Sequence, residues 1–257
     1  MPVLRTKTSR MWLPDALRGL ALLNMLAYHA MYDWVYVFGH ESSWYNIWAP
    51  GCHVWQQYIC WSFILLSGFS FPLAKRPAKN GLIVAGCAAV LTFVTAVFMP
   101  SEAIWFGVLH LNAAAVLLTC LVYPLLQRLP VGAGLAASAA LFALTNQLPE
   151  GYLGFENWRL CAVPAGLYKT NWFWLGLPDL TVFSSSDYFP LLPWVFLYWV
   201  GYFFARWFRA RCTAQPGLPP KALRPLCAVG SRTLLIYMLH QPVIYGALLG
   251  LRYLGFV

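Results

Sequence analysis

Residues 80–101 read NGLIVAGCAAVLTFVTAVFMPS, a stretch without a single charged side chain. A helix needs about 20 apolar residues to cross a bilayer, so this stretch is long enough to span one. Residues 103–127 repeat the pattern, since they hold no charge apart from a neutral histidine, His110. A water-soluble core does not need several such runs, and together they indicate an integral membrane protein.

The composition of the whole chain agrees with that interpretation. Of its 257 residues, 60% are hydrophobic and only 10% are charged, whereas a soluble domain carries about 25% charged residues. We therefore expect an all-α, polytopic transmembrane helix bundle that forms a single domain over residues 1–257. About seven spans are predicted, at roughly 13–38, 53–73, 81–99, 104–126, 131–147, 188–208 and 226–249.

The basic residues predict the orientation of these spans. With the amino terminus in the cytoplasm, 14 of the 17 Lys and Arg residues lie on the cytoplasmic side, and the exceptions are Arg159, Lys169 and Arg252. Such an asymmetry is the usual signal of membrane orientation. It accounts for the net charge of +9 without a nucleic-acid partner.

One long segment, 148–187, falls outside the membrane in this topology. It is rich in Trp, Gly and Pro, a composition that suits a lid or an interfacial loop. A segment of this length could also dip into the bilayer. If it crossed the bilayer fully, the chain would have eight spans.

The first predicted span carries ionisable residues at a helical spacing. Arg18 and His29 are 11 residues apart, which returns a helix to within roughly 20° of its starting direction and advances it about 16 Å. Asp33 follows His29 by four residues, so the two side chains can touch. A further 11 residues lead to His40, next to Glu41. One helix face is thus expected to present these groups across the membrane.

Each of these residues also has a structural explanation when taken alone. Arg18 could anchor the helix at the interface, and a lone buried histidine such as His29 is most often a packing residue. An ionisable group at the centre of a spanning helix costs about 2.5–3.5 kcal/mol, however. Because the costly groups share one face, the pattern favours a functional site.

Three further polar residues lie within or beside the apolar runs. His110 and His240 interrupt predicted spans, and Asp187 follows three serines. Both histidines could be structural, and Asp187 could cap the sixth helix or face a substrate. The seven cysteines include no CxxC pair, so we expect no metal site.

Six short motifs are spread over most of the chain: DALRGLALL at 15–23, GHESSW at 39–44, LSGFSF at 66–71, GVLH at 107–110, DYFP at 187–190 and LLIYMLH at 234–240. Together they resemble one family, the heparan-α-glucosaminide N-acetyltransferase-like membrane proteins. The spacing of Arg18 and His29 also resembles the signature of the wider transmembrane acyltransferase superfamily, which includes O-acetyltransferases of surface polysaccharides.

The resemblance implies an acetyl-CoA donor on the cytoplasmic side and an acceptor amine or hydroxyl, usually on a sugar, on the other side. In the heparan-type enzymes the catalytic histidine lies in the segment matched by His40, and the position matched by His29 is an asparagine. In the polysaccharide-modifying branch the histidine matched by His29 is the essential one. This sequence has both histidines, so the choice of base between His29 and His40 stays open.

Physical chemistry suggests roles for the remaining candidates. Coenzyme A carries anionic phosphates, which cytoplasmic cations can bind; the candidates are Arg18, Lys75, Arg76 and Lys79. A histidine can deprotonate the acceptor as it attacks the thioester, and a carboxylate can fix the imidazole tautomer. Asp33 and Glu41 are the candidate carboxylates. The residues expected to face the acceptor are Glu41, His110, Asp187 and His240.

We expect a protein shorter than the heparan-type enzymes, without their large luminal domain ahead of the first span. We therefore expect an inner-membrane enzyme acting on an envelope sugar or a small amine, in contact with membrane lipid and without nucleic acid, with a homodimer as the expected assembly. The main alternative is a transporter or proton-coupled carrier, because intramembrane His and Asp residues would also serve a proton relay. A membrane scaffold without catalysis is a third interpretation.

Overall fold

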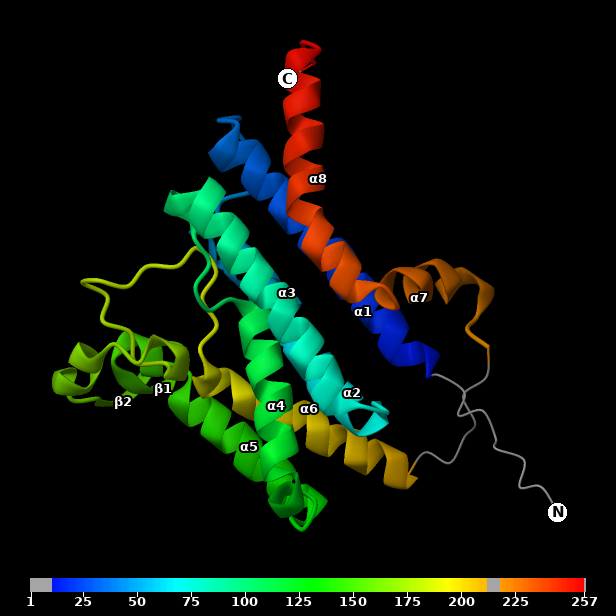
Figure 1. Ribbon diagram of the computed structural model, residues 1–257, viewed down its shortest axis with the longest axis vertical. Helices are drawn as coiled ribbons and strands as arrows, with labels where there is room; N and C mark the ends of the chain where they lie inside the picture. The colour runs from blue at the N-terminus through cyan, green and yellow to red at the C-terminus, as the bar shows by residue number, and fades with distance from the viewer. Residues whose placement is uncertain (1–10, 212–217, 257) are drawn as a thin grey trace. The chain divides into compact units, whose positions relative to one another are not determined.

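The computed structural model describes residues 11–211 and 218–256, and this part of the chain is mostly helical (Figure 1). The all-α fold that the sequence predicts is confirmed. The long helices are α1 (Trp12–Tyr32), α2 (Pro50–Ser70), α3 (Pro77–Phe98), α4 (Val108–Leu126), α5 (Val131–Thr145), α6 (Leu191–Arg211) and α8 (Thr233–Tyr253).

Shorter elements connect these helices. A π-helix, η1 (Asp33–Val37), continues α1, and a short α-helix, α7 (Arg224–Gly230), precedes α8. The strands β1 (Tyr152–Phe155) and β2 (Trp158–Ala162) form an antiparallel hairpin. The 3₁₀ turns are η2 (Phe71–Leu73), η3 (Pro100–Glu102), η4 (Leu148–Glu150), η5 (Ala165–Thr170), η6 (Phe173–Leu175) and η7 (Lys221–Leu223).

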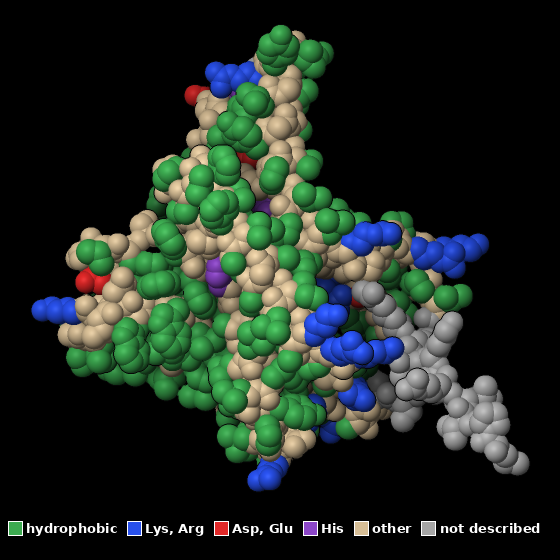
Figure 2. Space-filling model, viewed as in Figure 1, with side chains coloured by type: hydrophobic (Ala, Val, Ile, Leu, Met, Phe, Trp, Pro, Cys, Tyr) green, Lys and Arg blue, Asp and Glu red, His purple; other side chains and the backbone are tan. Residues whose placement is uncertain are grey.

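Four helical segments in the described chain are long and apolar enough to cross a membrane: Pro77–Phe98, Val108–Leu126, Val131–Glu150 and Thr233–Tyr253. Hydrophobic side chains accordingly cover much of the face seen in Figure 2. Helices α1, α2 and α6 have 21 residues each, which is also a membrane-spanning length. The total of seven spans and the cytoplasmic amino terminus stay predictions, and Arg5, Lys7 and Arg10 lie outside the described residues.

The chain forms two compact units, one made of residues up to 63 with those from 212 onward, the other of residues 64–211. In the first unit, α1 packs closely on α7 through a glycine from each helix. A Cβ on Gly19 would lie 2.1 Å from the Leu226 carbonyl oxygen, and a Cβ on Gly230 would lie 1.8 Å from the Asp15 carbonyl oxygen. The two backbones can approach this closely only because both positions lack a side chain.

The core of the first unit lies farther along α1. Leu22, Met25 and Ile59 are buried there, and residues of α2, α7 and α8 pack against them. The predicted seventh span, 226–249, is divided in the structure: α7 ends at Gly230 and α8 begins at Thr233. Gly230, which closely approaches the backbone of α1, is the last residue of α7 before this break.

The second unit contains α3–α6 and the end of α2. A Cβ on Gly201 of α6 would lie 2.1 Å from the Leu65 carbonyl oxygen, and one on Gly68 of α2 would lie 1.9 Å from the Tyr198 carbonyl oxygen. Glycines from both helices thus bring α2 and α6 into backbone contact. Where α4 ends, Arg206 of α6 donates hydrogen bonds to the carbonyl oxygens of Leu126, Gln127 and Leu129.

The segment 148–187 is described throughout and contains 3₁₀ turns and the β1–β2 hairpin, but no α-helix. Backbone that crosses a bilayer exposed to lipid must be helical or part of a closed barrel, because every polar group needs a partner. The structure therefore gives no helix in this segment that could form an eighth span, and the exact number of spans stays a prediction. The aromatic side chains of the hairpin region are exposed, including Trp158 and Trp172, which suits a position at the membrane surface.

Candidate functional site

The first predicted span ends in an unusual way. The α-helix gives way to the π-helix η1 at Asp33, and Phe38 N–H donates to the Asp33 carbonyl oxygen. Gly39 has a φ of +78°, a conformation that glycine adopts without strain. The turn lets His40 N–H donate to the Trp34 carbonyl oxygen, and the His40 ring stacks on the Trp34 ring with centroids 4.2 Å apart. The spacing predicted that His40 continues the helical stripe of His29. It does not, because the chain leaves the helix before it reaches His40.

His29 lies beside a histidine of α8. The rings of His29 and His240 meet edge to face with centroids 4.8 Å apart. The Nδ1 of His240 lies within hydrogen-bonding distance of the Tyr237 carbonyl oxygen. Two of the histidines that the sequence singles out, far apart along the chain, are thus brought together in the first unit.

Asp33 is fully buried, and both of its carboxylate oxygens accept hydrogen bonds from the side-chain amide of Gln241, at 2.8 and 2.9 Å. The sequence predicted a contact between Asp33 and His29. Among the described residues no hydrogen bond joins them, because α8 supplies an amide donor to the buried carboxylate instead. No role was predicted for Gln241 from the sequence, although a Gln beside His240 inside an apolar run was a visible signal.

Hydrogen bonds distinguish the histidines. In His110, Nδ1 accepts from the Gly107 N–H and Nε2 pairs with the hydroxyl of Thr92. That hydroxyl donates to the Ile104 carbonyl oxygen, so Nε2 of His110 must carry the hydrogen. Both ring nitrogens of His110 are therefore occupied. In contrast, no hydrogen bond engages the ring nitrogens of His29 or His40 within the described chain.

The carboxylate of Asp187 lies at the amino-terminal end of α4, although the residue precedes α6 in the sequence. Its Oδ2 accepts from the Val108 N–H at 3.1 Å, and a Cβ on Gly107 would lie 2.2 Å from the same oxygen. Burial of the carboxyl group raises the pKa of Asp187 to about 6, and the hydrogen bond from Val108 opposes that rise. Asp187 thus caps a helix, but α4 is the helix it caps.

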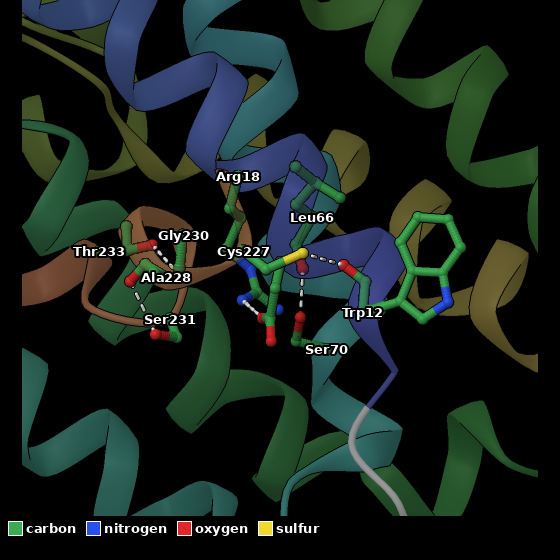
Figure 3. A network of polar contacts seen from close by, with 10 residues as sticks. Trp12, Arg18, Leu66, Ser70, Cys227, Ala228, Gly230, Ser231 and Thr233 are labelled. Atoms are coloured by element: carbon green, nitrogen blue, oxygen red, sulfur yellow. Dashed lines mark hydrogen bonds and ion pairs between the residues drawn. The ribbon is translucent and has the colours of Figure 1, made fainter. Parts of the chain in front are cut away.

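Arg18 pairs with a carboxylate on its own helix. Its guanidinium donates to Asp15, three residues earlier, and the Asp15 side chain is 7% exposed. Figure 3 shows Arg18 in this region, near the point where the Cys227 thiol donates to the Trp12 carbonyl oxygen at 3.5 Å. The partner of Arg18 was missed in the sequence, although an i, i+3 spacing of opposite charges is a recognised helical pair.

A second group of cations lies in the other unit. Lys75, Arg76 and Lys79 are exposed around the amino-terminal end of α3, where the helix dipole adds positive potential. Arg209 of α6 donates to the Pro72 carbonyl oxygen, which brings another cation close to this loop. The sequence did not predict Arg209 as a member of the group, because only the packing of α6 beside η2 places it there.

Glu41 is exposed beside His40. A hollow of about 390 Å³ between α5 and the hairpin is lined by apolar residues such as Ala140, Leu144 and Trp158, and it contains none of the candidate site residues. No group of three or more His, Cys, Asp or Glu side chains suited to a metal ion was found in residues 11–211 and 218–256.

The catalytic-domain model of heparan-alpha-glucosaminide N-acetyltransferase matches residues 10–242. The chain belongs to this family. The match covers the first span with His29 and His40, the basic loop at 75–79, and α8 as far as Pro242. Searches of curated proteins and of solved structures found no match. The chain is thus a multi-pass membrane protein of an acetyltransferase family.

Proposed function

We propose that this chain transfers an acetyl group from cytoplasmic acetyl-CoA to an amine or hydroxyl of a sugar or small amine on the other side of an inner membrane. Membership of the family supports acetyl transfer, and four apolar helices support a reaction at a membrane. One observation carries the proposal for this chain. The first span and its terminal turn hold two histidines, His29 and His40, whose ring nitrogens no described residue occupies.

His40 is our proposed base. The resemblance matches it to the catalytic histidine of the heparan-type enzymes, and its surroundings favour a fixed position for the ring. The turn at Gly39 ties the backbone of His40 to Trp34, whose ring stacks on the imidazole. His29 is proposed to line the same site, with His240 beside it. Glu41, next in sequence to His40, is proposed to contact the acceptor.

The proposed reaction transfers the acetyl group to the acceptor in a single step. The base removes a proton from the acceptor as its nitrogen or oxygen attacks the thioester carbonyl carbon. The new C–N or C–O bond forms, the C–S bond breaks, and the leaving sulfur takes the proton from the imidazolium. The histidine thereby returns to its neutral form. Acid–base assistance of this kind contributes about 10² to 10⁴ to a rate.

The donor phosphates are proposed to bind cations on the cytoplasmic side. Lys75, Arg76 and Lys79 suit this role because they are exposed and lie at the positive end of α3. Arg18 is a further candidate, although Asp15 already pairs with it. A phosphate would therefore have to share Arg18 with Asp15.

The test uses the purified full-length protein in detergent with radiolabelled acetyl-CoA and glucosamine as the acceptor. His40→Ala and His29→Ala are compared with His53→Ala, a change at an exposed histidine of α2 outside the proposed site. We expect His40→Ala to lose at least about 100-fold in turnover while it still binds acetyl-CoA, and His53→Ala to keep normal turnover.

The outcomes separate the competing assignments. Loss in His29→Ala alone would move the base to His29. If both variants keep near-normal turnover, a histidine base on the first span is wrong. If the wild-type protein neither binds acetyl-CoA nor transfers its acetyl group to any amine or hydroxyl acceptor, the carrier interpretation replaces the enzyme.

A further inference from the structure

The β1–β2 hairpin leaves the apolar side chains of its second strand largely uncovered. β1 packs against α5, where the rings of Phe155 and Phe142 have centroids 6.3 Å apart. In β2 every residue is exposed, including Trp158 at 79% and Leu160 at 67%. A two-stranded hairpin is only marginally stable in water unless an apolar face packs against something else. The described residues do not supply that cover for β2.

The hollow between α5 and the hairpin has the chemistry of a hydrocarbon site. Its volume is about 390 Å³, within the range of roughly 300–1,000 Å³ that small-molecule sites occupy. Ala140, Ala143 and Leu144 line it from α5, and Trp158 and Leu160 line it from β2. Such a lining would leave the hydroxyls of a sugar without hydrogen-bond partners, which is costly, whereas a hydrocarbon chain has no polar group to lose.

The hollow lies near the end of a helix that can cross the membrane. The segment Val131–Glu150 is long and apolar enough to do so, and α5 itself ends at Thr145, just beyond the residues that line the hollow. Figure 2 shows hydrophobic side chains gathered over this end of α5 and the hairpin. Tryptophan is enriched at the level where spanning helices leave the acyl chains. The hollow is therefore expected to meet membrane lipid.

Arg159, between Trp158 and Leu160 in the strand, adds a charge that the membrane orientation does not explain. It is one of the three basic residues that the predicted topology places outside the cytoplasm. Its guanidinium lies 4.3 Å from the centroid of the Tyr152 ring. Within residues 11–211 and 218–256 no carboxylate pairs with it. Its N–H groups are thus available to an anion, and a guanidinium suits phosphate especially well.

We propose that α5 and the hairpin bind a phospholipid of the surrounding membrane, with an acyl chain in the hollow and the phosphate on Arg159. The acyl chain covers Trp158 and Leu160, and the phosphate supplies the anion that Arg159 lacks. The bound lipid thereby holds the hairpin at the membrane surface. This site is independent of acetyl transfer, because none of the candidate residues for that reaction lines the hollow.

Filling the hollow tests the place of the acyl chain. Ala140→Phe puts a ring into the hollow, whereas Ala139→Phe puts the same ring at an exposed neighbouring position of α5 that does not line it. The purified full-length proteins in detergent are titrated with dioleoyl phosphatidylglycerol, and bound lipid is measured by native mass spectrometry. We expect Ala140→Phe to bind this lipid at least about tenfold more weakly than the wild type, and Ala139→Phe to bind it normally.

A second comparison tests the phosphate. Dioleoylglycerol has the same acyl chains as dioleoyl phosphatidylglycerol but no phosphate. The wild-type protein should bind the phospholipid about tenfold more tightly than dioleoylglycerol, because a hydrogen bond to a charged group contributes on this scale. Arg159→Gln should remove the preference and leave the binding of dioleoylglycerol unchanged. Lys169→Gln, at another exposed cation of the same segment, should keep it.

The outcomes separate the proposed site from other occupants of the hollow. Equal lipid affinities for Ala140→Phe and Ala139→Phe would overturn the acyl-chain site, and a full preference for the phospholipid in Arg159→Gln would overturn the phosphate contact. If the wild type is a dimer that Ala140→Phe dissociates without any loss of bound lipid, the hollow is an interface between two copies and the proposal is wrong. Should Ala140→Phe fail to fold, Leu160→Asn, at an exposed strand position, must weaken lipid binding for the proposal to stand.

Discussion

Asp187 gives the most direct test of the structure outside the membrane spans, through the change Asp187→Asn. Burial raises its pKa to about 6 in the folded protein, against an ordinary value of 3.8. A carboxyl group whose folded pKa is raised stabilises the fold at low pH, and this contribution is lost as the pH rises through the folded pKa. The wild-type protein should therefore lose stability between pH 5 and pH 8.

The magnitude follows from the two pKa values. Above pH 5 the unfolded carboxyl is ionised almost completely, whereas the folded one passes from about nine-tenths protonated at pH 5 to ionised at pH 8. For a folded pKa of about 6, the loss over this interval is about 1.4 kcal/mol, since one pH unit corresponds to 1.36 kcal/mol. In a chain of this size it lowers Tm by about 3–6 °C.

Asn at this position removes the titration and keeps an oxygen to accept from the Val108 N–H. The assay is thermal unfolding in detergent, followed by tryptophan fluorescence at a fixed scan rate, for both proteins at pH 5, 6, 7 and 8. The difference in Tm between Asp187→Asn and the wild type should grow in favour of the variant as the pH rises. Parallel pH profiles for the two proteins would refute a buried carboxyl at the start of α4.

Three further predictions concern packing and the position of the candidate base. Gly19→Ala should lower Tm strongly, because its Cβ would lie 2.1 Å from a backbone oxygen. Gly86→Ala, whose Cβ would meet nothing within 4 Å, should not lower Tm. Similar Tm values for the two variants would contradict the α1–α7 contact. Gly39→Ala, at a φ of +78°, should cost about 1–2 kcal/mol and reduce acetyl turnover, and unchanged turnover would argue against His40 as the base. Thr92→Val and His110→Ala should each lower Tm, with a double variant less harmed than the sum; additive losses would mean that the two side chains do not share a hydrogen bond.

The helical architecture could be predicted from the sequence because long apolar runs indicate helices that can cross a membrane. The predicted span at 81–99 corresponds to α3, Pro77–Phe98, and the one at 131–147 corresponds to α5, Val131–Thr145. Proline marks these boundaries: Pro77 opens α3, and Pro130 precedes α5. The break between α7 and α8 was not predicted; it follows Gly230, whose contact with another helix cannot be seen in the sequence.

The candidate site was predicted in its residue types but not in its pairings. Helical spacing draws attention to His29 and Asp33, and both lie at the end of the first predicted span. Periodicity within one helix cannot show which residue of another helix lies opposite. The partners, His240 and Gln241, come from α8, more than 200 positions later in the chain.

The surroundings of His40 and Asp187 also differ from those predicted, because helical spacing and sequence position do not show where a helix ends or which segment lies opposite. A spacing of 11 residues is meaningful only while the helix continues, and the π-helix with the Gly39 turn ends it before His40. Asp187 has the sequence position of a cap for the following helix, yet its carboxylate accepts from Val108. The chain beside it pairs with the segment before α4, where Phe189 N–H donates to the Phe106 carbonyl oxygen.

The geometry of α1 also bears on how one helix could serve both ends of the donor. Arg18 and His29 lie in the same uninterrupted helix, so their backbones are about 16 Å apart along its axis. Coenzyme A separates its charged phosphates from its thioester by a long flexible arm, which matches a cation and an imidazole at two levels of one helix. Asp15 holds the Arg18 guanidinium at its own level, so a donor phosphate that bound Arg18 as proposed would meet a cation already held in place. A fixed cation loses less conformational freedom on binding than a mobile one, which makes the Asp15–Arg18 pair a reasonable feature of a donor site and not only an anchor.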